Sequence, residues 1–593
     1  MTDKKVVVYV PLDDRPCNNE RVQLAGKAMG IEILFPPKDY FKNCLDNQPL
    51  NSTGSQLGSP DLIMGWLRNI SQSRNIDAYL VSLDQINSGG LIGSRVATDD
   101  DISTEKNRIV DLMSIIGNKP AYFFDTVMRL ASTLGFQNMG MYEYISTRLY
   151  AAHNRMPFRH SDKNIRKDHI LTYYDIDGAD HIISYQNMYN EDDRKLYTLT
   201  REQVNKYLTA RKRKFKLNVE ILEYIKGFPN TYISVGVDDS SHRLTIQENE
   251  ISYIEDFIVG SNNVFAGADE IAMCLLSRIA TDLYKNKPSV RVVYFGGAEN
   301  EKPDNWDFRS LKCNVDTHIR LSGGTLVTDD RPVDMEVLVL TKPRNGKTHQ
   351  QNSNDIHWHI NNNNTNNILT SVIDASSNPT GDSHFQRRLL GDFGSPIQLT
   401  KLLAYSSWNT VGNAIGMSIG HGIGRTAFIG LNHDTKLLRY ALEGQSKLLF
   451  TEYAKDICYK VGTAWYINKY LVDHLNDKTG QVFTKEQKEE IPWNFYKYGV
   501  NQNETNLGWG KSCLLWSSFI GMTTGDFNIH KLASIFYTNG DMFESYIGPY
   551  NNKITQVNWI NYPYENGDSA WFHLVFPWHR TFECTFPLNV SFK

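Results

Sequence analysis

Residues 6–18 read VVVYVPLDDRPCN, an apolar run of five residues followed at once by carboxylates, an arginine and an amide. A run that is apolar throughout is typical of a strand buried on both faces. Similar runs recur along the chain with helical stretches between them, which predicts parallel sheets covered by helices on both sides. The predicted strands are Val6–Val10, Ile31–Phe35, Ala78–Leu83, Ala121–Phe124, Tyr232–Val237, Val264–Ala266, Val290–Phe295, Thr325–Val327, Glu336–Leu340, Ile368–Ile373 and Leu402–Tyr405.

These runs outnumber the eight strands of a single barrel, so two Rossmann-like lobes are favoured over a TIM-like barrel. The predicted α/β region spans residues 1–425, with a possible division near residue 228 and a lid-like insertion at about 155–195. Residues 426–480 are expected to be helical. Residues 481–593 are rich in aromatics, Gly and Asn, and runs such as ITQVNWI and WFHLVF predict a β-rich C-terminal domain.

Two polar segments are interpreted without a function. Residues 343–367 contain the run Asn361–Asn364 and predict a mobile surface loop. The basic run Arg211–Lys214 lies in a helix-like stretch, and such a run is usually a solvated face.

Composition excludes several classes of partner. The formal net charge of -4 over 593 residues gives no basic footprint for nucleic acid. No apolar stretch approaches the roughly 18 residues of a membrane-spanning helix. The seven cysteines are scattered and form no C-x-x-C pair, which indicates reduced thiols rather than disulfides or structural zinc. We therefore expect a cytoplasmic protein with a small-molecule substrate and leave its oligomeric state open.

Ligands of parallel α/β proteins bind at the carboxyl ends of the strands, so the residues after each run are informative. The first run is followed by Asp13, Asp14, Arg15 and Asn18. Arg15 is expected either to keep an aspartate ionised or to bind a substrate anion. The structural alternative is a rigid turn held by an Asp–Arg pair.

The third run is followed by Asp84, Asn87, a Gly89-Gly90 pair and Arg95. Asp84 and Asn87 are candidates for contact with a polar substrate, and Arg95 with free backbone N–H groups is a candidate for an anion. The glycine spacing fits neither a P-loop nor a dinucleotide fingerprint, so no nucleotide cofactor is expected.

Acidic residues also follow the later runs. Asp125 with Arg129, and Asp269 after its own run, are candidates for substrate contact or for helix capping. Asp238 and Asp239 are the strongest catalytic candidates, because one carboxylate can orient the substrate while the other acts as acid or base. Their mutual repulsion also raises one pKa towards the useful range.

The last run is followed by Trp408, Asn409 and Asn413, which suit a hydroxyl-rich ligand such as a sugar, or else a buried Trp and a cap. The histidines form no metal-binding spacing. An Mg²⁺ or Mn²⁺ site at Asp13 and the Asp238 pair is conceivable, but nothing in the spacing requires it, so no metal ligand and no cofactor are assigned.

The ordered motifs PLDDRPCN, SLDQINSGGLIGSR, FDTVMRL, VDDSS, GADE and YSSWNTVGN resemble a bacterial family catalogued only as a domain of unknown function, number four-one-two-seven. The resemblance covers most of residues 6–420 and extends towards PWHRTFE near the C-terminus. It implies a shared fold and a bacterial source, but it implies no activity.

The predicted function is a hydrolase of glycosidase type, acting on a small sugar-like substrate. This chemistry needs two carboxyl groups about 5–10 Å apart, and the candidates are Asp238, Asp239, Asp13 and Asp84. One alternative is an isomerase, racemase or lyase of a small hydroxy or amino acid, with Arg15, Arg95 or Arg129 binding the substrate carboxylate. The other is a sugar-binding protein without catalysis.

Overall fold

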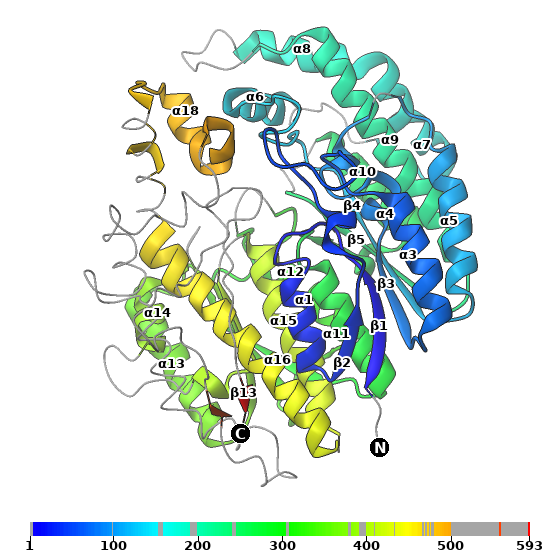
Figure 1. Ribbon diagram of the computed structural model, residues 1–593. Helices are drawn as coiled ribbons and strands as arrows, with labels where there is room; N and C mark the ends of the chain where they lie inside the picture. The colour runs from blue at the N-terminus through cyan, green and yellow to red at the C-terminus, as the bar shows by residue number, and fades with distance from the viewer. Residues whose placement is uncertain are drawn as a thin grey trace.

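The computed structural model describes residues 4–97, 99–151, 158–189, 198–239, 245–303, 307–376, 381–390, 399–407, 410–431, 433–464, 468, 471–473, 475, 479–499, 557–558 and 591–592. Two parallel sheets with helices on their faces form the molecule, which confirms the α/β prediction with Rossmann-like lobes (Figure 1). Neither sheet closes on itself, so the TIM-like barrel is not formed.

The first sheet has six strands in the order β2-β1-β3-β4-β5-β6. Its strands are β1 (Lys5–Val10), β2 (Ile31–Leu34), β3 (Ala78–Ser82), β4 (Ala121–Val127), β5 (Thr231–Val237) and β6 (Val264–Ala266). Its helices are α1 (Glu20–Ala28), α2 (Lys38–Phe41), α3 (Pro60–Ser73), α4 (Leu83–Ser88), α5 (Ser103–Ile116), α6 (Met141–Ala151), α7 (Lys163–Thr172), α8 (Gly178–Tyr189), α9 (Arg201–Lys226), α10 (Ile246–Tyr253) and α11 (Ile271–Tyr284).

The second sheet has five strands in the order β11-β10-β9-β7-β8. Its strands are β7 (Ser289–Phe295), β8 (Thr325–Leu326), β9 (Met335–Thr341), β10 (Leu369–Ala375) and β11 (Ala404–Ser407). The helices of this half are α12 (Leu311–Leu321), α13 (His349–Thr365), α14 (Ser383–Leu389), α15 (Val411–Ile429), α16 (Thr435–Tyr453) and α18 (Lys485–Glu490).

Most strand residues are apolar because helices cover both faces of each sheet. Along β1, Val8 and Val10 join a core with α3, α5 and α9, whereas Val7 and Tyr9 join a core with α1 and α11. The second sheet repeats this alternation: one face packs on α12 and α15, the other on α13, α14 and α16. Successive strand side chains point to opposite faces, so burial on both faces favours long apolar runs.

The two halves meet through helices α11 and α15, which approach closely along a row of glycines in α15. A Cβ built at Gly416 would lie 2.3 Å from the Glu270 side chain, and one at Gly420 would lie 3.0 Å from the backbone nitrogen of Cys274. No larger residue fits at these positions without moving α11. The first sheet lies between α3, α5 and α9 on one face and α1 and α11 on the other. The second sheet lies between α12 and α15 on one face and α13 and α14 on the other. The α1/α11 and α12/α15 layers face each other in the middle of the molecule.

Some segments differ from the sequence-based expectations. The possible division near residue 228 precedes β5 and β6, which both belong to the first sheet, so the sheets change only after Ala266. The segment at about 155–195 contains α7 and α8. The prediction of a loop at 343–367 is wrong, because α13 occupies most of it. Most of the predicted β-rich domain lies outside the described residues; within them, 485–498 is helical and Val557–Asn558 pairs with Ser591–Phe592.

Candidate functional site

The first sheet has a topological switch point at its carboxyl edge, where the winding of the chain reverses. Strand β2 lies on one side of β1 and strands β3 to β6 lie on the other, so the reversal falls between β1 and β3. Ligands of open parallel sheets bind at such a point. Asn43 ties the two loops together: its backbone N–H donates to Asp14 Oδ1 at 3.1 Å, and its side-chain amide donates to the Gly89 carbonyl at 2.7 Å.

Arg15 connects the loop after β1 with the loop after β6. Its guanidinium donates to both carboxylate oxygens of buried Asp13 at 2.8–3.1 Å and to Asp269 Oδ2 at 2.8 Å. Asn18 donates to Asp13 Oδ1 at 3.0 Å. Burial lowers the pKa of Arg15, but the negative charges of Asp13 and Asp269 raise it by more than burial lowers it. The pKa therefore ends above its ordinary value, and Arg15 stays charged. Because β1 and β6 are not neighbours, the two loops meet over the ends of the strands between them.

Two further arginines hold the Asp238 pair, which follows β5. Arg95 contacts the Asp238 carboxylate and donates to the Thr133 hydroxyl at 3.2 Å. Arg129 Nη1 donates to Asp239 Oδ2 at 3.0 Å. Asp239 has a φ of 34°, a left-handed conformation that is uncommon for a residue other than glycine. The two carboxylates therefore point to different arginines.

The charges of all three arginines act on Asp238. Burial raises the pKa of Asp238, and Arg95, Arg129 and Arg15 lower it while Asp239 raises it; the pKa ends above its ordinary value. A carboxyl group with a raised pKa is a candidate for proton transfer. The edge thus combines one carboxyl group of raised pKa with three arginine cations.

Behind this cluster lies a buried triad of Asp84, Lys214 and Asp125. Lys214 donates to Asp84 Oδ1 at 2.6 Å and also contacts Asp125, which accepts from Asn218 at 2.8 Å. Burial raises the pKa of Asp84 to about 6, with Lys214 lowering it and Asp125 raising it. The Asp84 and Asp125 side chains have no exposed surface, and their shared partner Lys214 links the ends of β3 and β4.

Exposure separates the predicted carboxylates into two groups. Asp13, Asp84 and Asp125 are fully covered. The side chains of Asp239 and Asp269 are 23% and 21% exposed. The most exposed of the predicted carboxylates are therefore Asp239, which binds Arg129, and Asp269, which binds Arg15.

Sequence reasoning missed the contribution of α9. The interpretation of its basic run as a solvated face is wrong for Arg211 and Lys214, which are buried. Arg211 donates to the carbonyls of Met128 and Arg129 at 2.9 and 2.8 Å and so supports the loop that carries Arg129. Arg211, Lys214 and Asn218 share one helix face at positions i, i+3 and i+7, and this spacing was the available signal.

The remaining predicted residues lie around this edge or outside the described chain. Asn87 lies in α4 and is buried, and its amide has no hydrogen-bond partner among the described residues. Asn413 is in the first turn of α15, next to Gly412, where a Cβ would lie 2.7 Å from the Ala266 carbonyl at the end of β6. Trp408 and Asn409 lie outside the described residues.

No group of three or more His, Cys, Asp or Glu side chains is arranged to hold a metal ion within the described ranges. Within the same part of the chain, none of the helices combines the length and apolar character needed to cross a membrane.

The chain belongs to DUF4127, a family of proteins of unknown function. The family model matches residues 7–174 and 185–587, which include both sheets and all the candidate residues. A search of curated proteins and a search of solved structures each found no match.

Proposed function

We propose that this DUF4127 member is an acid–base enzyme that acts on a small polar substrate carrying a carboxylate, as an isomerase, racemase or lyase of a hydroxy or amino acid. One observation carries the proposal: three arginines surround Asp238, and each is matched to an aspartate at the carboxyl edge of one sheet. A neutral sugar offers no anion to these cations, whereas a substrate carboxylate does.

In this mechanism the substrate carboxylate binds at the Arg129–Asp239 pair. Both side chains are partly exposed, at 12% and 23%, so a substrate carboxylate can replace Asp239 on Arg129. Displaced Asp239 then accepts the proton from the carbon next to that carboxylate. The electron pair delocalises onto the carboxylate, which Arg129 stabilises.

Asp238 supplies the second proton transfer. Its raised pKa lets it hold a proton, which it delivers either to the opposite face of the same carbon or to a hydroxyl group that leaves from the adjacent carbon as the double bond forms. The first outcome inverts the centre and the second eliminates water. After Asp238 has given up its proton, Arg95 stabilises the carboxylate that remains.

The test is exchange of the α-proton in D₂O, followed by proton NMR over a panel of 2-hydroxy and 2-amino acids. We expect at least one acid to lose its α-proton signal, and Asp239→Asn to slow this exchange at least about a hundredfold. Asp111→Asn is the matched control, because Asp111 pairs with Arg68 on the protein surface. Its exchange rate is expected to equal that of the wild type.

The hydrolase prediction is tested beside it with nitrophenyl glycosides. Release of nitrophenol without α-proton exchange would replace the present proposal by a glycosidase. A cytoplasmic location is also part of the proposal, and the described cysteines Cys44, Cys274 and Cys313 are free thiols, which suits a reducing compartment.

A further inference from the structure

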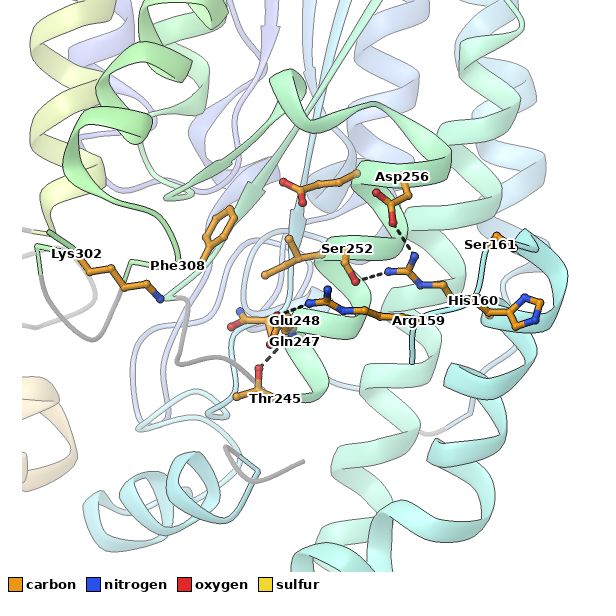
Figure 2. A pocket seen from close by; sticks show the side chains of 13 residues that line it. Arg159, His160, Ser161, Thr245, Gln247, Glu248, Ser252, Asp256, Lys302 and Phe308 are labelled. Atoms are coloured by element: carbon orange, nitrogen blue, oxygen red, sulfur yellow. Dashed lines mark hydrogen bonds and ion pairs between the residues drawn. The ribbon is translucent and has the colours of Figure 1, made fainter. Parts of the chain in front are cut away.

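A cavity of about 500 Å³ lies beside the candidate site, and none of the predicted site residues lines it (Figure 2). Its walls come from α10 with the turn that follows it, from α7 with the segment before it, and from the loop between β7 and α12. The volume is within the range of small-molecule sites. Three separate parts of the chain, two from the half with the first sheet and one from the half with the second, therefore line a space of ligand size.

The inner wall of this cavity is built from buried polar side chains. Gln247 is fully buried, and its amide donates to the carbonyls of Met128 and Asp238 at 3.2 and 3.1 Å. Arg166 is 4% exposed, donates to Asp256 at 2.6 Å and contacts the Ser252 hydroxyl. Within the described chain the Arg166 Nε–H has no hydrogen-bond partner, which leaves a buried donor on a cavity-lining side chain.

The outer rim carries charges of both signs in a loose arrangement. Arg159 and Glu248 are 3.7 Å apart, beyond hydrogen-bonding distance, and their side chains are 75% and 27% exposed. Lys302 extends towards the cavity from the opposite side (Figure 2). An exposed pair at this distance is weak, so Arg159 can turn towards a ligand.

We propose that this cavity binds a small zwitterion, such as a free amino acid, with its carboxylate towards Arg159 and its ammonium group towards Glu248. A ligand that is only anionic would face the carboxylates of Glu248, Glu255 and Asp256. A ligand that is only cationic would face the arginines and Lys302. A molecule that carries both a positive and a negative charge matches both the carboxylates and the cations of the cavity. This binding site is separate from the site of the proposed reaction.

The experiment is a thermal-shift screen of the full chain with the twenty standard amino acids, followed by calorimetry of those that bind. Propionate and propylamine are the probes with a single charge. We expect at least one amino acid to raise the Tm, while neither single-charge probe does. Arg159→Gln and Glu248→Gln are each expected to weaken that amino acid's binding about tenfold or more. Arg68→Gln, at an exposed pair elsewhere, is the matched control and is expected to bind like the wild type.

Asp239→Asn separates this site from the proposed active site. It is expected to leave the amino acid's affinity unchanged; loss of binding in this variant would place the amino acid at the Arg129–Asp239 pair and overturn the cavity proposal. The proposal also falls if no amino acid raises the Tm, if propionate alone binds as well, or if both cavity variants bind normally. Thermal unfolding without ligand checks that the variants are folded.

Discussion

The carboxyl edges of the two sheets have the same parallel topology and very different polar groups. At the first edge, the aspartates after β1, β5 and β6 bind arginine side chains, and those after β5 and β6 are partly open to solvent. At the second edge, buried Asp374 of β10 accepts from the backbone N–H groups of Ser376 and Asp382 at 3.2 and 2.7 Å. The turn after β7 is also closed, because the Ala298 N–H donates to the Thr341 hydroxyl.

This difference shows that topology alone does not decide where a site forms. A parallel sheet offers a crevice at its carboxyl edge, but the loops of the protein can fill it themselves. At the second edge, Asp374 satisfies the backbone of its own loop, and Asp456 accepts from the Ser407 N–H while it pairs with Lys455 and Lys460. At the first edge, charged side chains from several loops pair with each other.

The largest expected effect comes from removing the cation of the buried triad. Lys214→Met leaves Asp84 and Asp125 buried without their counter-charge, and losing one partner of a buried ion pair costs about 3–5 kcal/mol. The free energy of unfolding in urea at pH 7 measures this loss. Lys212→Met is the control on the same helix: its pairs with Asp100 and Asp175 are more exposed, so we expect about 1 kcal/mol or less. Equal losses in the two variants would contradict the buried triad.

The second edge provides a pH-dependent contrast. Burial raises the pKa of Asp374 to about 7, and Asp382 raises it too, against the hydrogen bonds that it accepts. The folded state then holds a proton that the unfolded state releases near pH 4. This contribution is fully present below about pH 4 and is lost as pH rises through about 7.

We therefore expect the stability difference between wild type and Asp374→Asn to change by up to about 4 kcal/mol between pH 4 and pH 7.5. Denaturant unfolding at several pH values measures it, and groups common to both proteins, including Asp84, cancel in the difference. A constant difference would mean that Asp374 has the same pKa in both states.

A glycine substitution tests whether the second edge is closed by its own backbone. Gly296 has a φ of 118°, and an added Cβ would lie 2.3 Å from the Thr341 carbonyl oxygen. Gly346 also has a positive φ, of 76°, but nothing lies within 4 Å of an added Cβ. Gly296→Ala is expected to lose about 2 kcal/mol more stability than Gly346→Ala, because only Gly296 adds a collision to the backbone strain. Similar losses in urea unfolding would show that the turn after β7 has room.

All eleven predicted strands are present, because burial on both faces of a sheet requires a mostly apolar run in the sequence. The sequence also predicted which residues follow the strands of the first sheet, since the end of an apolar run marks the end of a strand. The sequence did not show that Asp84 and Asp125 are covered. Their partner Lys214 lies in α9, far from both residues in the chain, and carries no strand signal.

Helix α13 shows where composition misled the prediction. The Asn-rich segment was expected to be a loop because asparagine is common in turns. In the structure, buried Asn363 donates to Glu336 at 2.9 Å and to the Thr370 hydroxyl at 3.1 Å, so part of the asparagine run packs against the second sheet. A local start signal was present as well: Thr348 and Gln351 form a capping box.

The smallest expected effect tests that start signal. The Thr348 hydroxyl accepts from the Gln351 N–H at 3.2 Å, and the Gln351 side chain accepts from the Thr348 N–H at 2.8 Å. Thr348→Ala removes the first bond, and the loss of such a cap costs about 1 kcal/mol. Thr365→Ala is the control at the other end of the same helix, where the hydroxyl only donates to the Asn361 carbonyl within the last turn. It is expected to change the free energy of unfolding by less than about half as much. If Thr348→Ala is as stable as the wild type, the capping box does not start α13, and the packing of Asn363 on the second sheet holds the helix instead.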